Sequence, residues 1–297
     1  MKYSLKKEYE RINGDNYSIF DSPNYGKIQY KLERGEGTFI LFIHGISGGY
    51  DQGIISAKGL FEYDADNNLL SISRFGYLQS DLPDDSTPEN QCLAYKSLLD
   101  YLNIDAVVIV GTSAGGTIAL KFALMFPDIC KGLILIGSAY PSLEKHKGPN
   151  GPPSFIYNDK IFEFLLNYMN YIVLLMFGIS KKEYQSGIDE DKKDIDNLLS
   201  SILPIKPRKE GILNDQDITN MDMIKNYHDY NIEKIKAPIL ILHAKNDSLA
   251  KYEKMIPASK RFQNARVITY EKGGHVLFSH GKETRNYIKN FLKELGK

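Results

Sequence analysis

The sequence has few cysteines and no excess of either charge, and each shortage excludes a class of protein. Two cysteines in 297 residues cannot build a disulfide framework. Cys92 falls inside a predicted helix and Cys130 just before a predicted strand, so we expect buried free thiols and a reducing, cytoplasmic setting. Lysine plus arginine equals aspartate plus glutamate, at 37 each. Without a basic excess, the composition gives no indication of nucleic-acid binding.

Long hydrophobic runs are also missing. The first ten residues are charged and lack the apolar core of a signal peptide. The most apolar stretch, residues 161–179, contains Glu163, Asn167 and Asn170, and its unbroken run covers only 172–177. A membrane span needs about 20 apolar residues. We therefore expect no stable membrane insertion, and predict that this stretch is a helix or helix pair covering another part of the molecule.

Strand and helix patterns alternate along much of the chain. Short apolar runs predict strands at 17–20, 27–32, 38–43, 69–73, 106–110, 132–136, 238–242 and 266–270. Helical patterns follow the strands, with clear examples starting at 88, covering 117–126 and covering 283–295. Such alternation predicts an α/β fold with a mostly parallel, doubly wound sheet.

The alternation stops at Tyr140-Pro141 and resumes near residue 236. Residues between these points are poor in β-runs and rich in asparagine, lysine and proline, with helical patches. We therefore predict a core formed by residues 1–140 and 236–297, with an inserted, mainly helical cap at 141–235.

A short glycine-rich segment carries the first sign of chemistry. Gly111-Thr112-Ser113-Ala114-Gly115 matches the pattern G-x-S-x-G, which places a serine on a sharp turn between a strand and a helix. The five residues alone would equally suit a loop whose serine caps the helix. A buried strand before the segment and a helical pattern after it favour the first interpretation, so we predict Ser113 as a nucleophile.

A serine hydroxyl becomes a good nucleophile only when a base accepts its proton. His275 stands out among the six histidines because it follows two glycines directly after the 266–270 strand. Asp247 follows the 238–242 strand, lies between Ser113 and His275 in chain order, and could orient the imidazole. Asn-Asp is also a common turn dipeptide, but the order of the three residues on strand ends favours a Ser-His-Asp catalytic triad.

An oxyanion hole would complete the site. Ala114, directly after the nucleophile, can donate one backbone amide. The second donor should come from the loop after the 38–43 strand, where we choose Ile46 and leave Ser47 open as the alternative. We expect no metal and no cofactor, because no histidine, cysteine and aspartate cluster has metal-ligand spacing.

Taken together, these segments resemble the α/β-hydrolase superfamily, in particular esterase-like serine hydrolases with an inserted cap. The resemblance rests on the stretches His44-Gly45-x-x-Gly48-Gly49-x-Asp51-Gln52-Gly53, Arg74-Phe75-Gly76-Tyr77, Gly111-Thr-Ser113-Ala-Gly115-Gly116, Asn246-Asp247 and Gly273-Gly274-His275. It implies the α/β-hydrolase fold and the triad Ser113, Asp247 and His275. Substrate transfers less readily, because one scaffold hosts many chemistries.

Differences between this sequence and the motifs of related subfamilies limit the reactions that we expect. Proline-iminopeptidase-like members usually carry a tryptophan after the nucleophile, whereas this chain has Ala114 and no tryptophan. Dehalogenases and epoxide hydrolases use an aspartate nucleophile. We therefore expect hydrolysis of a small carboxylic ester or lactone. Hydrolysis of a carbon–carbon bond in a diketone-like substrate is the alternative, and a ligand-binding protein with little turnover is a third.

The apolar stretch within the inserted residues bears on the substrate. Most of its side chains should pack onto the core, but some could line a pocket for an acyl or alkyl group. The candidates for this lining are Phe162, Leu166, Met169, Met176 and Phe177. A small apolar ester-like molecule is the partner that we expect, and a homodimer is compatible with the sequence.

Overall fold

The computed structural model describes residues 2–61, 67–143 and 151–296. One eight-stranded sheet runs through the molecule in the order β1-β2-β4-β3-β5-β6-β7-β8. The strands are β1 (Ser18–Ser22), β2 (Gly26–Glu33), β3 (Phe39–Ile43), β4 (Asn68–Ile72), β5 (Val107–Thr112), β6 (Cys130–Ile136), β7 (Ile239–Ala244) and β8 (Ala265–Tyr270). β1 pairs antiparallel with β2 and β2 with β4, while every later pairing is parallel.

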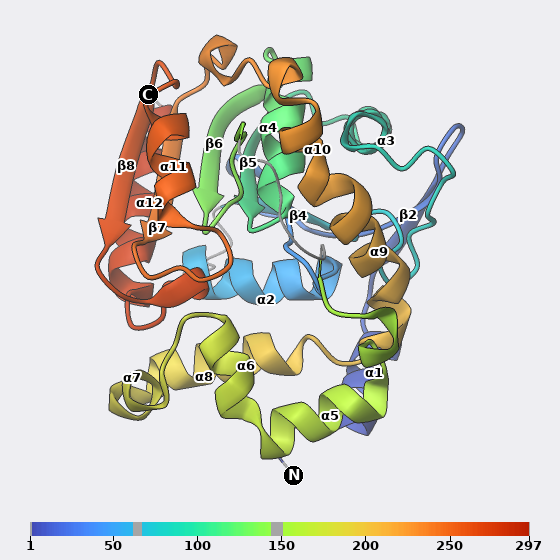
Figure 1. The fold of residues 1–297 in the computed structure, drawn as a ribbon. Coiled ribbons are helices and arrows are strands. Elements are labelled where there is room, and N and C mark those ends of the chain that lie inside the picture. The colour runs from blue at the N-terminus through green and yellow to red at the C-terminus, as the bar shows by residue number, and fades with distance from the viewer. Residues whose placement is uncertain (1, 62–66, 144–150, 297) are drawn as a thin grey trace.

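The helices cover both faces of this sheet (Figure 1). They are α1 (Leu5–Asn13), α2 (Tyr50–Phe61), α3 (Pro88–Tyr101), α4 (Gly115–Met125), α5 (Asp159–Tyr168), α6 (Asn170–Met176), α7 (Lys181–Ser186), α8 (Asp189–Ser200), α9 (Lys209–Asn214), α10 (Asn220–Lys225), α11 (Tyr252–Ser259) and α12 (Gly281–Leu295). Shorter turns of helix are η1 (Ser154–Ile156), η2 (Lys206–Arg208), η3 (Asp215–Thr219), η4 (Tyr227–Asp229), η5 (Ile232–Lys234) and η6 (Gly274–Val276).

Side chains of the central strands alternate between the two faces of the sheet, and each face has its own hydrophobic core. In β5, Val107 and Ile109 pack with the helices α3 and α4 on one face, whereas Val108 and Val110 pack with α2 and α12 on the other. Successive side chains of a strand point to opposite faces, so a strand covered on both sides must be apolar throughout. This explains the unbroken apolar runs that predicted the strands.

The residues between β6 and β7, here called the β6–β7 insertion, contain α5 to α10 and no strand among those that the structure describes. In Figure 1, helices α5 to α8 lie beyond the carboxyl ends of the parallel strands. The apolar stretch at 161–179 is a pair of helices, as predicted. A third apolar cluster joins this insertion to Tyr3, Tyr77 and Phe278.

Helix α1 lies against the insertion, and the sequence patterns did not predict it. The Tyr3 backbone N–H donates to Asn167 (3.0 Å), and the Leu5 N–H donates to a carboxylate oxygen of Glu163 (2.8 Å). Because the helix is polar and its partners lie more than 150 residues away, no local pattern indicates where it packs.

All eight predicted strands are present, with ends shifted by one or two residues. The predicted mostly parallel, doubly wound sheet is confirmed.

Candidate active site

Ser113 lies at the sharp turn between β5 and α4. Its backbone φ is +52°, in the left-handed region that non-glycine residues seldom adopt. Such strain is typical of a turn that exposes its central side chain. The end of β3 passes very close to this turn, because a Cβ on Gly115 would lie 2.3 Å from the carbonyl oxygen of Ile43. Glycine is therefore required at that position.

His275 and Asp247 come together at the carboxyl ends of the last two strands. The imidazole Nδ1 lies 3.0 and 2.9 Å from the two carboxylate oxygens of Asp247. Both side chains are buried. The carboxylate is itself oriented, because its Oδ1 accepts the backbone N–H groups of Leu249 and Ala250 at 2.9 Å each. With Nδ1 donating to the carboxylate, Nε2 is the nitrogen free to accept a proton.

The loop that carries His275 is tied to the β6–β7 insertion. The His275 backbone N–H donates to the carbonyl of Phe177 (2.7 Å). A Cβ on Gly274 would lie 2.1 Å from that carbonyl oxygen, so the approach requires glycine. Asn246 bridges the same two segments, accepting from the Gly274 N–H (2.9 Å) and donating to the Gly178 carbonyl (3.1 Å).

The loop after β3 passes beside Ser113. A Cβ on Gly45 would lie 2.8 Å from the Cβ of Ser113. His44 accepts the Arg74 N–H at Nε2 (3.0 Å) and donates from Nδ1 to the Gly45 carbonyl (2.7 Å). Burial, and then the nearby charge of Arg74, lower the pKa of His44 well below its usual value. This imidazole is therefore neutral and holds the loop in place.

A buried guanidinium grips the same loop from the β6–β7 insertion. Arg208 donates to the Gly48 carbonyl (2.5 Å) and forms a two-point ion pair with Asp51, at 3.1 and 2.8 Å. Arg11 contacts the same carboxylate at 2.7 Å. Burial alone would raise the pKa of Asp51, but the two guanidinium groups outweigh it and hold the pKa well below its ordinary value.

A second buried pair lies beside the first. Arg74 donates to Asp215 (2.6 Å for one of two contacts), and the Tyr77 hydroxyl also bonds this carboxylate. Burial and then the Asp215 charge raise the pKa of Tyr77 well above its usual value. The insertion thus bonds the loop directly at Gly48, and through Asp215 it holds Arg74, whose backbone N–H donates to His44 of that loop.

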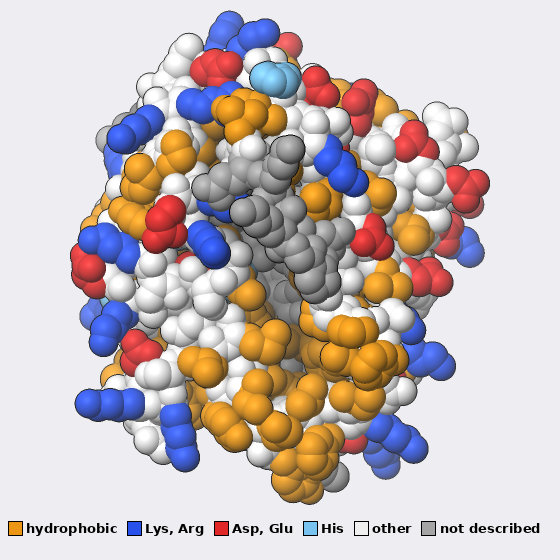
Figure 2. Space-filling model, viewed as in Figure 1, with side chains coloured by type: hydrophobic (Ala, Val, Ile, Leu, Met, Phe, Trp, Pro, Cys, Tyr) orange, Lys and Arg blue, Asp and Glu red, His pale blue; other side chains and the backbone are white. Residues whose placement is uncertain are grey.

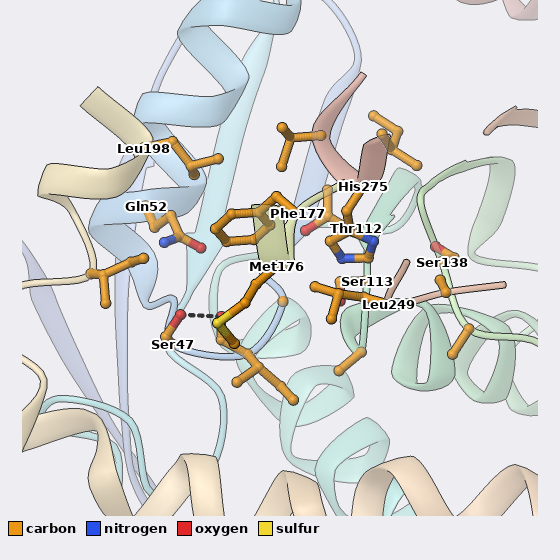
Figure 3. A pocket seen from close by; sticks show the side chains of 18 of the residues that line it. Ser47, Gln52, Thr112, Ser113, Ser138, Met176, Phe177, Leu198, Leu249 and His275 are labelled. Carbon is orange, nitrogen blue, oxygen red and sulfur yellow. Dashed lines mark hydrogen bonds between the residues drawn. The ribbon is translucent and has the colours of Figure 1, made fainter. Parts of the chain in front are cut away.

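A pocket of about 1270 Å³ opens over Ser113, and apolar side chains make up most of its wall. Ile46, Ala114, Ser113 and His275 all line it, and Figure 3 shows the imidazole of His275 turned toward Ser113. Asp247 is behind the histidine and outside the wall.

Three of the five expected apolar lining residues are on this wall, namely Phe162, Met176 and Phe177. Leu166 is not, because it is buried within the apolar cluster of the insertion, where it is only 1% exposed. Met169 is also off the wall, at the junction of α5 and α6. Leu165 and Val173 line the pocket from these same helices.

Sequence reasoning did not single out Arg208, Asp215 or Gln216. Arg208 holds the loop after β3, Asp215 pairs with Arg74 and Tyr77 beside it, and Gln216 lines the pocket. No local signal could have found the first two, because Arg208 and Asp51 are 157 positions apart in the chain. No group of three histidine, cysteine, aspartate or glutamate side chains suited to a metal occurs in the described parts of the chain. Helices long and apolar enough to cross a membrane are likewise not found there.

Known proteins with this architecture are numerous. The chain is 23% identical over 266 residues to 2-hydroxymuconate semialdehyde hydrolase of Pseudomonas putida, covering 88% of this chain and 89% of that protein. An alpha/beta hydrolase fold protein from Nakamurella multipartita superimposes with a TM-score of 0.78 at 19% identity, covering 95% of this chain and all of that one. An esterase from Exiguobacterium antarcticum gives a TM-score of 0.64 at 21% identity, covering 93% and 99%.

The family described as the alpha/beta hydrolase fold matches residues 38–281. This range starts just before β3, includes Ser113, Asp247 and His275, and ends at the start of α12. The chain belongs to the alpha/beta hydrolase family.

Proposed function

We propose that this protein is a serine hydrolase that cleaves a small, apolar carboxylic ester or lactone through an acyl-enzyme. Ser113 is the nucleophile, His275 the base and Asp247 the residue that orients the base. The observation that carries the proposal is the buried His275–Asp247 contact, at 2.9 and 3.0 Å. It lies directly behind His275, which shares the pocket wall with the strained Ser113.

The reaction begins with proton transfer from the Ser113 hydroxyl to Nε2 of His275 as the serine oxygen attacks the carbonyl carbon. The carbonyl π electrons move to its oxygen. When this tetrahedral intermediate collapses, the alkoxide leaves and takes the proton from Nε2. A water molecule then gives a proton to Nε2, attacks the acyl-enzyme and releases the acid, and Ser113 regains its proton. Asp247 stays ionised and fixes the tautomer throughout.

Two backbone amides are proposed to bind the oxyanion. Ala114 begins the turn into α4, whose N-terminal end favours negative charge. Ile46 is the proposed second donor, and Ser47, which lines the pocket from the same loop, is the alternative. Both proposed donors line the pocket.

The wall of the pocket favours an apolar acyl group. Phe162, Leu165 and Val173 face it from α5 and α6, and Ile195 and Leu198 face it from α8. The β6–β7 insertion supplies these residues, so we propose that it acts as a cap that shapes the acyl site. Apolar walls with few polar anchors are usual for small-molecule pockets.

Labelling and turnover test the proposal together. Wild-type protein should react with a fluorophosphonate probe and hydrolyse p-nitrophenyl butyrate, and Ser113→Ala should abolish labelling and reduce kcat by several powers of ten. Ser56→Ala is the matched control, since Ser56 lines the same pocket away from the elbow. Unchanged hydrolysis by Ser113→Ala would disprove the assignment. Ligand binding without labelling would instead support a non-catalytic binding protein.

Carbon–carbon bond hydrolysis is a second candidate, favoured by the relative from Pseudomonas putida, which is named as a 2-hydroxymuconate semialdehyde hydrolase. The same serine, histidine and oxyanion donors could act on a ketone carbonyl. A substrate panel separates the two candidates. An ester hydrolase should cleave acyl esters at least about a hundredfold faster than a vinylogous diketone, because a carbanion leaves less readily than an alkoxide and needs its own stabilisation.

A further inference from the structure

Large apolar side chains gather on the outside of helices α5 and α6. Among the described residues, fourteen large hydrophobic side chains are exposed, and six of them lie between 161 and 176. They are Ile161, Phe164 and Tyr168 on α5 and Tyr171, Leu175 and Met176 on α6. We call these six residues the apolar face. Figure 2 shows hydrophobic side chains gathered over this part of the molecule.

The apolar face is a true helix face with a separate buried side. Positions 161, 164 and 168 share one side of α5, and 171 and 175 share one side of α6. Leu166 and Leu174 point the other way and are 1% and 2% exposed. Phe164 and Leu175, in contrast, are 54% and 62% exposed. Other side chains of these two helices pack into the interior of the protein, so the six exposed residues are not needed to fill it.

Along the stretch of chain that carries the apolar face, the exposed charges are lysines. Between 155 and 182 the charged residues are Asp159, Lys160, Glu163, Lys181 and Lys182. Both acids are turned to other segments of the protein. Asp159 accepts the Tyr9 hydroxyl and the Lys206 N–H at 2.8 Å each, and Glu163 accepts the Leu5 N–H at 2.8 Å. The three lysines are exposed.

An apolar helix face bordered by lysines is the pattern of segments that lie in the surface of an anionic lipid layer. A lipid surface matches both features at once, because its anionic headgroups attract the lysines and its acyl chains receive the apolar side chains. Helix α5 has ten residues and is therefore about 15 Å long, half the hydrocarbon thickness of a bilayer. It could lie in the interface but could not span it.

The same two helices also form the wall of the catalytic pocket. Met176 is 52% exposed and lines the pocket, and Leu165 and Val173 line it from the opposite side of the apolar face. We propose that the apolar face docks peripherally on an anionic lipid surface, and that the substrate of Ser113 is an ester dissolved in that lipid. The substrate would reach the pocket past Met176 without crossing water. This substrate class rests on the proposed function, whereas docking does not.

Vesicle flotation tests docking without any turnover. Wild-type protein should float with vesicles of equimolar phosphatidylcholine and phosphatidylglycerol, less with phosphatidylcholine alone, and less at high salt. Phe164→Ser with Leu175→Ser should weaken binding about tenfold or more, because two apolar side chains no longer leave water. Tyr101→Ser, on the distant helix α3 and similarly exposed at 63%, is the control and should bind as wild type.

Activity measurements distinguish the docking proposal from the proposed hydrolysis by Ser113. The double variant should hydrolyse water-soluble p-nitrophenyl acetate as wild type does, but lose about tenfold on an ester embedded in the vesicles. Ser113→Ala should float normally and hydrolyse neither substrate. Wild-type protein that ignores both vesicles would overturn the docking proposal. So would a dimer on size exclusion that the double variant dissociates, since the face would then bind a second copy.

Discussion

Replacing Arg208 by methionine should both destabilise the protein and slow its chemistry. The guanidinium is fully buried and donates to four oxygens, namely both carboxylate oxygens of Asp51 and the carbonyls of Gly48 and Pro204. Methionine fills similar space with no donor. The carboxylate of Asp51 would stay buried with Arg11 as its remaining partner, and the Gly48 carbonyl would lose its hydrogen bond.

The size of the effect follows from that count. Breaking a buried ion pair by removing one partner costs about 3–5 kcal/mol. Arg11 still contacts Asp51 at 2.7 Å, so the lower end applies, at about 3 kcal/mol. With an unfolding entropy of about 2.1 cal/mol/K per residue over 297 residues, this lowers Tm by about 5 °C. A loosened loop beside Ser113 should reduce kcat by about tenfold.

The stability lost on replacing Arg208 by methionine should also depend on pH, and it should be smaller in acid. The pKa of Asp51 is depressed in the folded protein, so its ion pairs stabilise the fold at pH values above the unfolded pKa of about 4. That contribution is lost as pH falls toward the folded pKa. The difference in stability between wild type and Arg208→Met should therefore be full at pH 7 and shrink below about pH 4.

Thermal unfolding by calorimetry at pH 7 and at about pH 3, with kcat on a soluble ester at pH 7, measures all three effects. Lys206→Met is the matched control, because that exposed lysine bonds Asp159 through its backbone N–H, and the substitution should shift stability by less than about 0.5 kcal/mol. We expect Tm to fall by about 5 °C. A Tm that differs from that of wild type by less than about 1 °C, together with an unchanged kcat, would refute the view that Arg208 holds the loop.

Three further substitutions probe the site. Gly45→Ala would place a Cβ 2.8 Å from that of Ser113, so fluorophosphonate labelling should slow by about a hundredfold, and normal labelling would show that the loop yields. Asp247→Asn should lower kcat by about ten-thousandfold with little change in Tm, because the amide favours the wrong tautomer of His275, and a small drop in kcat would argue against the triad. Asn246→Ala removes two hydrogen bonds and should cost about 1–2 kcal/mol in urea unfolding, whereas an unchanged midpoint would make that bridge incidental.

Local patterns were enough to predict the sheet and the positions of the main chemical groups. Ser113, Asp247 and His275 each come within about five residues of the end of a strand, and the carboxyl ends of parallel strands meet at one edge of a sheet. The strand runs are apolar on both faces, which made them easy to recognise. Both features can be recognised from residues that are close together in the sequence.

Local patterns could not predict which side of a helix faces the pocket, or which residues far apart in the sequence form ion pairs. Leu165 lines the pocket while Leu166 is buried in the insertion, and one helical step of about 100° separates them. Both are leucines in an apolar run, so hydrophobicity cannot distinguish the two. The Arg208–Asp51 and Arg74–Asp215 pairs join segments more than 140 positions apart. Their partners are set by tertiary packing, which no local window contains.

The contact between the N-terminal segment and the insertion determines how the protein should be handled. Lys2 and Tyr3 lie against the insertion, where Lys2 pairs with Asp196, and the first helix packs on α5. Figure 1 marks the N-terminus beside α5 and the C-terminus at the opposite end of the molecule. An affinity tag fused before Lys2 would therefore sit next to the apolar face and compete with anything that binds there. A tag placed after α12 would leave that face accessible, and is the form to immobilise on a sensor surface.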